Sequence, residues 1–182
     1  MKLIYPVAKV TATQTGRGKD FVSKARIALG LGLLTVGCGA ASRMPDAQVR
    51  QAGNLPCFSV ADDAETRVSP PDLFALVVES REPAKQIWSF VYKPGRSSKL
   101  GPNQCLVYGV VPAGAAAAHP APPLEAGVVY SVFLNARPTN RSPIQGYSTL
   151  FCLVQSPNLA VQVRQIEWDS AHRRWRTEAC AT

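Results

Sequence analysis

Histidine is scarce in this sequence, and its scarcity limits the chemistry that the protein can carry out. Only two histidines occur in 182 residues, His119 and His172, and they lie far apart in the chain. No Cys-x-x-Cys pair accompanies them, so a zinc site is disfavoured. A lone loop histidine is far more often solvated than catalytic, and we expect neither to serve as a general acid or base.

The motifs of the common enzyme classes are missing as well. The sequence has no Gly-x-Ser-x-Gly turn, no His-Glu-x-x-His helix, no phosphate loop and no dinucleotide fingerprint. Asp62, Asp63 and Glu65 come closest to paired carboxylates, but consecutive acids in a polar connection usually form a solvated turn. We therefore expect a protein that is not an enzyme, with no catalytic residue, metal, cofactor or small-molecule substrate.

The sequence also lacks the run of about 20 apolar residues that a bilayer-spanning helix needs. Its apolar run from Ile27 to Val36 is about half that length, follows Lys24 and Arg26, and precedes Gly37 and Cys38. A positive region, a short apolar region and a small residue, in this order, are typical of a secretory signal peptide. This order predicts export of the protein from the cytoplasm.

The five residues from Leu34 to Cys38 resemble the bacterial lipobox, although Thr35 stands where leucine is usual. The resemblance implies that Cys38 becomes an acylated N-terminus, held in the membrane by about 0.8 kcal/mol per buried methylene. Gly39 in place of aspartate implies, by the same resemblance, the periplasmic side of the outer membrane, with the inner membrane as the alternative. For the segment itself, the alternatives are an ordinary secretory signal and a buried apolar helix.

Acidic residues are outnumbered by basic ones, and the imbalance is concentrated at the front of the chain. The formal net charge is +8, from 20 basic and 12 acidic residues. Six basic residues and one acid precede Cys38, so the remainder has 20 − 6 = 14 basic and 12 − 1 = 11 acidic residues, or +3. The surplus indicates a targeting segment and not a phosphate-binding surface, so we expect no nucleic-acid partner.

These observations divide the chain into three parts. Residues 1–37 form an N-terminal extension plus a lipoprotein signal peptide, with translation expected to start at Val22. Residues 38–53 comprise the lipidated cysteine and a small, polar, flexible tether. Residues 54–182 form one folded domain of ordinary size.

Proline is more frequent than in an average protein, and it favours strands over helices. The 15 prolines recur too closely after residue 44 for long helices. Between them lie seven or eight short segments rich in β-branched and aromatic residues, which is typical of an immunoglobulin- or fibronectin-like antiparallel β-sandwich. The expected strands are Leu55–Ala61, Leu73–Ser80, Gln86–Lys93, Gln104–Val111, Val128–Asn135, Tyr147–Gln155, Ala160–Trp168 and Arg173–Ala179.

Patterns within and between these strands give further expectations. In the third strand, Trp88, Phe90 and Tyr92 alternate with smaller residues, so one face of that strand should be largely aromatic. Residues 169–172 should form a hairpin turn between the last two strands. Residues 112–127, rich in alanine and proline, should be a surface connection without regular structure.

Four cysteines remain in the exported part of the chain once Cys38 is assigned to lipid. An even number in an oxidising compartment predicts two disulfides. Four cysteines allow three connectivities, which the sequence leaves open. The central places of Cys105 and Cys152 in apolar strands, and those of Cys57 and Cys180 near the domain ends, favour the pairs Cys105–Cys152 and Cys57–Cys180.

The order of short motifs along residues 55–180 resembles that of a family of bacterial lipoproteins described as type VI secretion immunity proteins. The motifs are Cys57-Phe-Ser-Val, Trp88-Ser-Phe, Cys105-Leu-Val-Tyr-Gly-Val-Val-Pro112, Pro123-Leu-Glu-Ala-Gly-Val-Val-Tyr130, Phe151-Cys152, Ile166-Glu-Trp168 and Cys180. The long N-terminal extension and the alanine- and proline-rich connection depart from that family. The resemblance implies a periplasmic lipoprotein that binds and neutralises a toxin effector delivered by a neighbouring cell.

An inhibitor of this kind needs a rigid scaffold that presents a few aromatic or arginine anchors. Candidate contact regions are the loops Pro94–Asn103 and Arg137–Pro143 and the hairpin around Trp175, with the arginines Arg137, Arg141, Arg173, Arg174 and Arg176. The simpler interpretation of the hairpin places Trp175 inward and its arginines in solvent. The competing functional hypothesis is a constitutive envelope lipoprotein that serves as an assembly or adhesion-type binding module.

Overall fold

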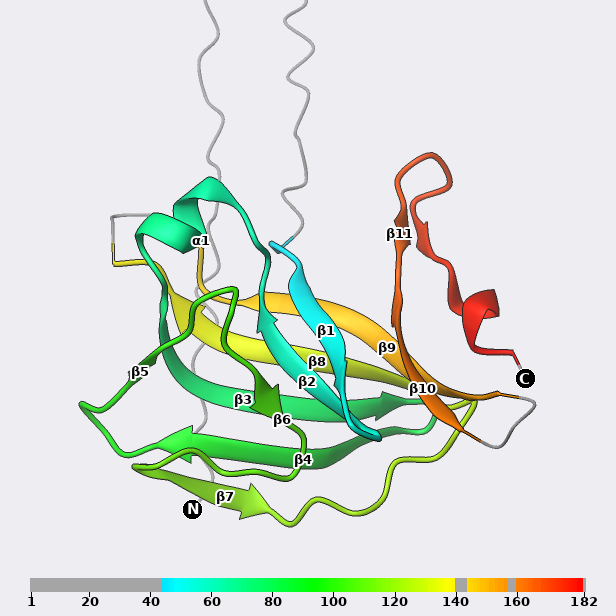
Figure 1. Ribbon diagram of the computed structural model, residues 1–182, viewed down its shortest axis with the longest axis horizontal. Coiled ribbons are helices and arrows are strands. Elements are labelled where there is room, and N and C mark those ends of the chain that lie inside the picture. The colour runs from blue at the N-terminus through cyan, green and yellow to red at the C-terminus, as the bar shows by residue number, and fades with distance from the viewer. Residues whose placement is uncertain (1–43, 140–143, 157–159, 182) are drawn as a thin grey trace, which may run out of the picture. The chain divides into compact units, whose positions relative to one another are not determined.

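The structure, a computed structural model, describes residues 44–139, 144–156 and 160–181 (Figure 1). Strands hold 53% of the described residues and helices 7%, so the protein is all-β. Two antiparallel sheets, of seven and three strands, are combined with two disulfides. The predicted class, a disulfide-stapled antiparallel β-sandwich, is confirmed.

The larger sheet has the strand order β10-β9-β8-β3-β4-β7, and the short β5 pairs with the start of β3. The smaller sheet has the order β1-β2-β6, and β11 and β12 form a separate hairpin. One short helix, α1, joins β2 to β3, and the 3₁₀ helix η1 follows β12. The bounds are β1 (Ala47–Ala52), β2 (Leu55–Val60), α1 (Ala64–Val68), β3 (Asp72–Arg81), β4 (Ala84–Tyr92), β5 (Ser98–Lys99), β6 (Leu106–Val107), β7 (Ala115–His119), β8 (Val129–Arg137), β9 (Tyr147–Gln155), β10 (Val161–Ile166), β11 (Trp168–Asp169), β12 (Arg174–Trp175) and η1 (Thr177–Cys180).

The main core lies between the two sheets, and the period-two pattern of the strands fills it. Trp88, Phe90 and Tyr92 alternate along β4 and are at most 7% exposed, so the predicted aromatic face points into this core. Phe58 of β2 meets Phe151 of β9 edge to face, with ring centroids 5.4 Å apart. This contact joins the small sheet to the large one.

Side-chain amides join the sheets where β1 runs beside β10. The Gln165 amide accepts from the Val49 N–H at 2.8 Å and donates to the Ala47 carbonyl at 3.2 Å. Gln51 reciprocates, donating to the Val161 carbonyl at 3.0 Å and accepting from the Val163 N–H at 3.2 Å. Each side-chain amide thus takes the place of a neighbouring strand and forms hydrogen bonds with backbone N–H and C=O groups at the edges of β1 and β10.

A second, smaller core forms on the other side of β9. Leu150 and Cys152 of β9, Ile166 of β10 and Cys180 of η1 are all buried there, with Trp175 packed against them. The disulfide Cys152–Cys180 closes this cluster, with a Cα–Cα distance of 5.9 Å. The C-terminal segment is therefore fastened to the large sheet both covalently and by apolar packing.

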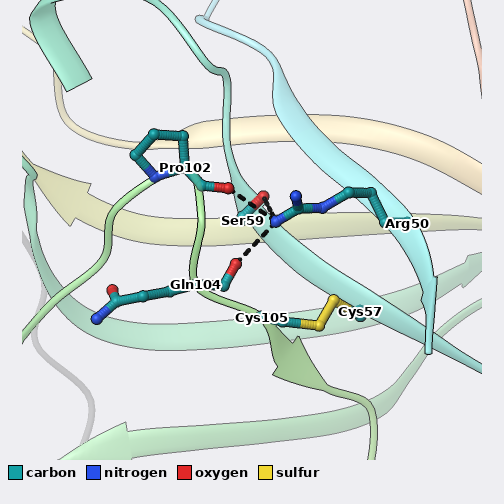
Figure 2. The surroundings of a disulfide bond; sticks show 6 residues. All are labelled: Arg50, Cys57, Ser59, Pro102, Gln104 and Cys105. Atoms are coloured by element: carbon teal, nitrogen blue, oxygen red, sulfur yellow. Dashed lines mark hydrogen bonds between the residues drawn. A yellow bond between two sulfur atoms is a disulfide. The ribbon is translucent and has the colours of Figure 1, made fainter. Parts of the chain in front are cut away.

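The predicted disulfide pairing is wrong, although all four cysteines form disulfides. Cys57 pairs with Cys105, at a Cα–Cα distance of 5.4 Å (Figure 2), and Cys152 pairs with Cys180. The physical reason is strand adjacency, since Cys57 lies opposite Val107 in the β2–β6 pair, two residues from Cys105. Position along the sequence gave no information about this neighbour.

Several predicted elements need correction. The predicted tether extends too far, because Ala47–Ala52 form β1 and place Ala47 and Val49 in the core. The predicted strand Gln104–Val111 shrinks to β6, since the chain turns after Val107, where the Val110 N–H bonds to the Val107 carbonyl. The predicted strand Arg173–Ala179 divides into β12 and η1.

The alanine- and proline-rich connection is also more ordered than predicted, because it contains β7 and is tied to the core. The Tyr108 hydroxyl donates to the Pro122 carbonyl at 2.7 Å, and the Glu125 N–H donates to the Tyr130 hydroxyl at 2.9 Å. Burial raises the pKa of Tyr108 to about 12. Both phenols therefore stay protonated at neutral pH and hold this segment against the sandwich.

Candidate partner-binding surface

The C-terminal hairpin carries three of the predicted contact arginines and is built around one aspartate. The Asp169 carboxylate accepts from the backbone N–H groups of Ala171 at 3.0 Å and His172 at 3.1 Å, which closes the turn. Arg173 completes the turn with a positive φ of 52°. The predicted hairpin is confirmed, and its turn is shifted by one residue, to 170–173.

Two tryptophans form the body of this hairpin. Trp168 and Trp175 are directly paired across β11 and β12 and meet edge to face, with ring centroids 5.3 Å apart. Trp175 packs into the second core, whereas Arg173, Arg174 and Arg176 are exposed. The simpler interpretation of the sequence, with Trp175 inward and the arginines in solvent, is confirmed.

Arg174 and Arg176 of the hairpin make long ion pairs, and all but the one to the buried Asp169 lie between exposed side chains. Arg174 lies 3.5 Å from Glu178, and Arg176 lies 3.7 Å from Glu167 and 3.6 Å from Asp169. Exposed ion pairs of this kind contribute about 0 to 1 kcal/mol each. The guanidinium groups can therefore exchange these partners for carboxylates of a bound protein at little cost.

Asp169 is the charged residue of the hairpin that folding perturbs most clearly. It is 8% exposed, and its carboxylate lies 2.9 Å from Nδ1 of His172. The side-chain hydrogen bond with His172 is the main cause of a lowered pKa of Asp169, with backbone N–H groups and the charge of Arg176 adding to it. The folded hairpin therefore favours the ionised carboxylate.

This pKa shift makes the stability of the hairpin depend on pH. The contribution of Asp169 is fully present above its unfolded pKa, about 3.9, and is lost as the pH falls through the lower folded pKa. We expect thermal unfolding midpoints to fall more steeply toward pH 2 in the wild type than in Asp169→Asn. Glu167→Gln, at an exposed neighbouring site, should keep the wild-type profile. Parallel curves for wild type and Asp169→Asn would contradict the assignment.

A hollow of about 500 Å³ opens beside the hairpin. Val129, Leu150 and Trp175 give it apolar side chains, and Arg81 and Glu82 give it charges of opposite sign. Hollows with an aromatic wall and a nearby arginine are typical of sites that receive an anchor side chain of a partner. The hollow and the hairpin together form one continuous candidate surface, since Trp175 belongs to both.

The other predicted contact regions lie at the opposite end of the large sheet. Asp72 pairs with Lys99 of β5 and with Arg137 of β8, which brings the loops around these two residues together. The Arg137 guanidinium lies 5.8 Å from the centre of the Phe74 ring. β8 has nine residues, so Arg137 is roughly 27 Å from Val129 and the hairpin side. Arg141 and the lipidation candidate Cys38 lie outside the described residues.

Arg50 is a residue of this second end that the sequence analysis missed. One nitrogen of its guanidinium donates to the Pro102 carbonyl at 2.7 Å, the Gln104 carbonyl at 3.0 Å and the Ser59 hydroxyl at 3.2 Å (Figure 2). Together with the Cys57–Cys105 disulfide, these bonds fix the end of the predicted contact loop Pro94–Asn103. In the sequence, only the alternation of Arg50 with the apolar Val49 could have indicated that Arg50 lies on a strand.

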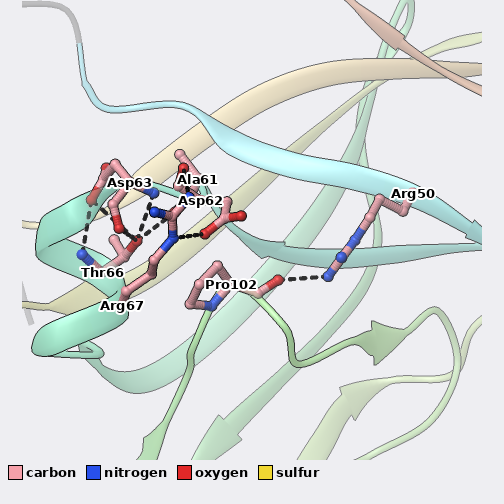
Figure 3. A network of polar contacts seen from close by, with 7 residues as sticks. All are labelled: Arg50, Ala61, Asp62, Asp63, Thr66, Arg67 and Pro102. Atoms are coloured by element: carbon pink, nitrogen blue, oxygen red, sulfur yellow. Dashed lines mark hydrogen bonds and ion pairs between the residues drawn. The ribbon is translucent and has the colours of Figure 1, made fainter.

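The acidic run beside Arg50 caps a helix. Asp63 caps α1 by accepting from the Thr66 N–H at 2.8 Å, and the Thr66 hydroxyl accepts in return from the Asp63 N–H (Figure 3). Asp62 pairs with Arg67 at 2.6 Å, and this hydrogen bond lowers the pKa of Asp62. The expected solvated turn is thus a helix start, and its carboxylates have structural partners.

The remaining candidates for chemistry are placed as follows. His119 ends β7, and its Nδ1 lies 2.9 Å from the Gln86 amide nitrogen. Across residues 44–139, 144–156 and 160–181, no three His, Cys, Asp or Glu side chains gather as metal ligands would. Within the same ranges, no helix has the length and apolarity to cross a membrane.

The fold and the hairpin together define a disulfide-stapled β-sandwich that displays an arginine- and tryptophan-bearing surface. No family model matches this chain, and no curated protein or solved structure is significantly similar to it.

Proposed function

We propose that this protein is a periplasm-facing lipoprotein, anchored through Cys38, that binds and neutralises a toxin delivered by type VI secretion. The observation that carries the proposal is the hairpin with its adjoining hollow. Exposed arginines and a half-buried tryptophan are the residue types that most often dominate binding energy at protein interfaces. Here Trp175 borders the hollow, and the exposed arginines Arg174 and Arg176 flank it in the hairpin.

Rigidity of this surface supports the same function. Cys152–Cys180 fastens the segment after the hairpin, and the Asp169 carboxylate fixes the turn at its tip. A surface that is ordered before binding loses less conformational entropy when the partner docks. Interfaces of about 800 Å² per partner range from weak to very tight binding. Tight inhibition of a toxin therefore depends on a small loss of conformational entropy as well as on the area buried.

The direct test is binding of residues 39–182, produced with both disulfides formed, to the product of the neighbouring gene. We expect a one-to-one complex of nanomolar Kd by calorimetry, about −12 kcal/mol. We also expect rescue of cells that express this product in their periplasm. Absence of both binding and rescue, for a folded domain, would favour the alternative function of a constitutive envelope binding module.

Arginine variants then locate the interface. The triple variant Arg173→Ala, Arg174→Ala and Arg176→Ala should weaken the complex by about a hundredfold or more, because central arginine anchors commonly contribute at least 2 kcal/mol. Arg137→Ala, at the other end of the sheet, serves as the matched control. The opposite pattern, with loss of binding in the control alone, would move the interface to the Arg137 end.

A further inference from the structure

The edge strands of the two sheets differ in how well they are protected from pairing with another chain. An unpaired edge strand offers a row of free backbone groups to any extended chain, and proteins usually cover, shorten or charge such edges. The facing edges of β1 and β10 are capped by the amides of Gln165 and Gln51. β5, β6, β11 and β12 have only two residues each.

β7 is the exception among the described strands. It ends the seven-stranded sheet and pairs only with β4. Its sequence is four alanines followed by His119, so no charged side chain lies on the edge, and its only irregularity is a register shift opposite Ser89 and Phe90 of β4. Residues 116–119 are all exposed, and the three alanines among them have side chains too short to cover the backbone. This edge therefore offers main-chain recognition with almost no steric barrier.

A basic hollow adjoins the start of β7. It has a volume of about 460 Å³ and is lined by Lys93 and Arg96 of the turn after β4, and by Gly114 and Ala115 at the β7 start. None of its lining residues is acidic, and within the described part of the chain neither basic side chain makes an ion pair. A carboxylate placed there would gain two cations.

We infer that the free edge of β7 is a strand-addition site for an extended segment of a protein partner. The incoming segment pairs its backbone with Ala115–His119 and places an acidic side chain in the hollow at Lys93 and Arg96. In this mode of recognition, main-chain hydrogen bonds give affinity and neighbouring pockets give specificity. The surface is separate from the hairpin, because β7 and β10 are opposite edges of the sheet, so the inference goes beyond the proposed function.

The test needs no knowledge of the natural partner. A random-peptide display library is selected on residues 39–182, the chain that contains the whole compact unit from Ala41 onward, and enriched peptides are synthesised. We expect them to carry an acidic residue near one end. In their complexes, amide hydrogen exchange should slow at Ala115–His119, because these groups become hydrogen-bonded. Selection without enrichment, or protection located elsewhere, would overturn the inference.

Paired variants make the assignment specific. Ala116→Lys with Ala118→Lys places two charges on the edge and should weaken the enriched peptides at least about tenfold. Lys93→Glu with Arg96→Glu should weaken them similarly. Ala84→Lys, at an exposed alanine far along β4, is the control and should bind like the wild type. Equal binding by all variants would contradict strand addition at β7.

Two measurements distinguish strand addition from unfolding of the edge variant and from dimerisation of the wild type. The edge variant should keep the wild-type thermal midpoint, because residues 116 and 118 are exposed, and a variant that unfolds early is replaced by Ala117→Lys. Sedimentation of the wild type should show a monomer. A wild-type dimer that the edge variant dissociates would overturn the inference in favour of β7 pairing with a second copy.

Discussion

Replacing Cys152 and Cys180 together by alanine is expected to lower the free energy of unfolding by about 3.6 kcal/mol. The estimate follows from the chain entropy that a cross-link spanning 28 residues removes from the unfolded state. A loss of this size is a large fraction of the 5 to 15 kcal/mol that stabilises a typical domain. Urea unfolding of both proteins, followed by tryptophan fluorescence, gives the two values.

The other disulfide is the matched control for this prediction. Removing Cys57 and Cys105 in the same way should lower the unfolding free energy by about 4.1 kcal/mol, because it spans 48 residues. The two variants should differ in hydrogen exchange: loss of Cys152–Cys180 should speed exchange in the C-terminal segment, and loss of Cys57–Cys105 should speed it near Arg50. Identical exchange patterns would contradict separate roles for the two cross-links.

The sequence predicted the strands whose burial pattern is local. β4 has aromatic residues at alternate buried positions, and β9 is an apolar run that is buried along most of its length, so the composition of both agrees with the fold. β1 and β7 escaped detection because alanine, glutamine and arginine dominate them. Their strand conformation depends on neighbours, since β1 lies between β2 and the amide of Gln165, and β7 lies against β4. Such dependence leaves no local signal.

Contacts between distant residues were the least predictable. The disulfide partner of Cys57 depends on which strand lies beside β2, and the role of Arg50 depends on the course of the chain near Pro102. The hairpin could be predicted, because its turn residues and its arginines are adjacent in sequence. The hollow beside the hairpin could not be predicted from the sequence, because Arg81, Val129 and Trp175 come from three separate parts of the chain.

Phe58→Ala is the second change with a large expected effect, a loss of about 3 to 5 kcal/mol in unfolding free energy. Phe58 is fully buried, and its ring contacts Phe151 across the two sheets. Truncation therefore leaves a cavity at the contact that joins the sheets. The urea midpoint should fall with an unchanged slope, because the surface exposed on unfolding stays nearly the same.

Leu55→Ala, on the same strand, is the control for Phe58→Ala. Leu55 is 42% exposed, so its truncation removes less buried surface and should cost no more than about 1 kcal/mol. Equal losses for the two variants would contradict the packing of β2 on the large sheet.

Combined with the arginine variants, the pair Phe58→Ala and Leu55→Ala separates effects on folding from effects on binding. Phe58→Ala should lose stability and keep its affinity for the proposed partner while folded, whereas the triple arginine variant should lose affinity and keep its stability. A protein whose hairpin served only to stabilise the fold would show the two losses together.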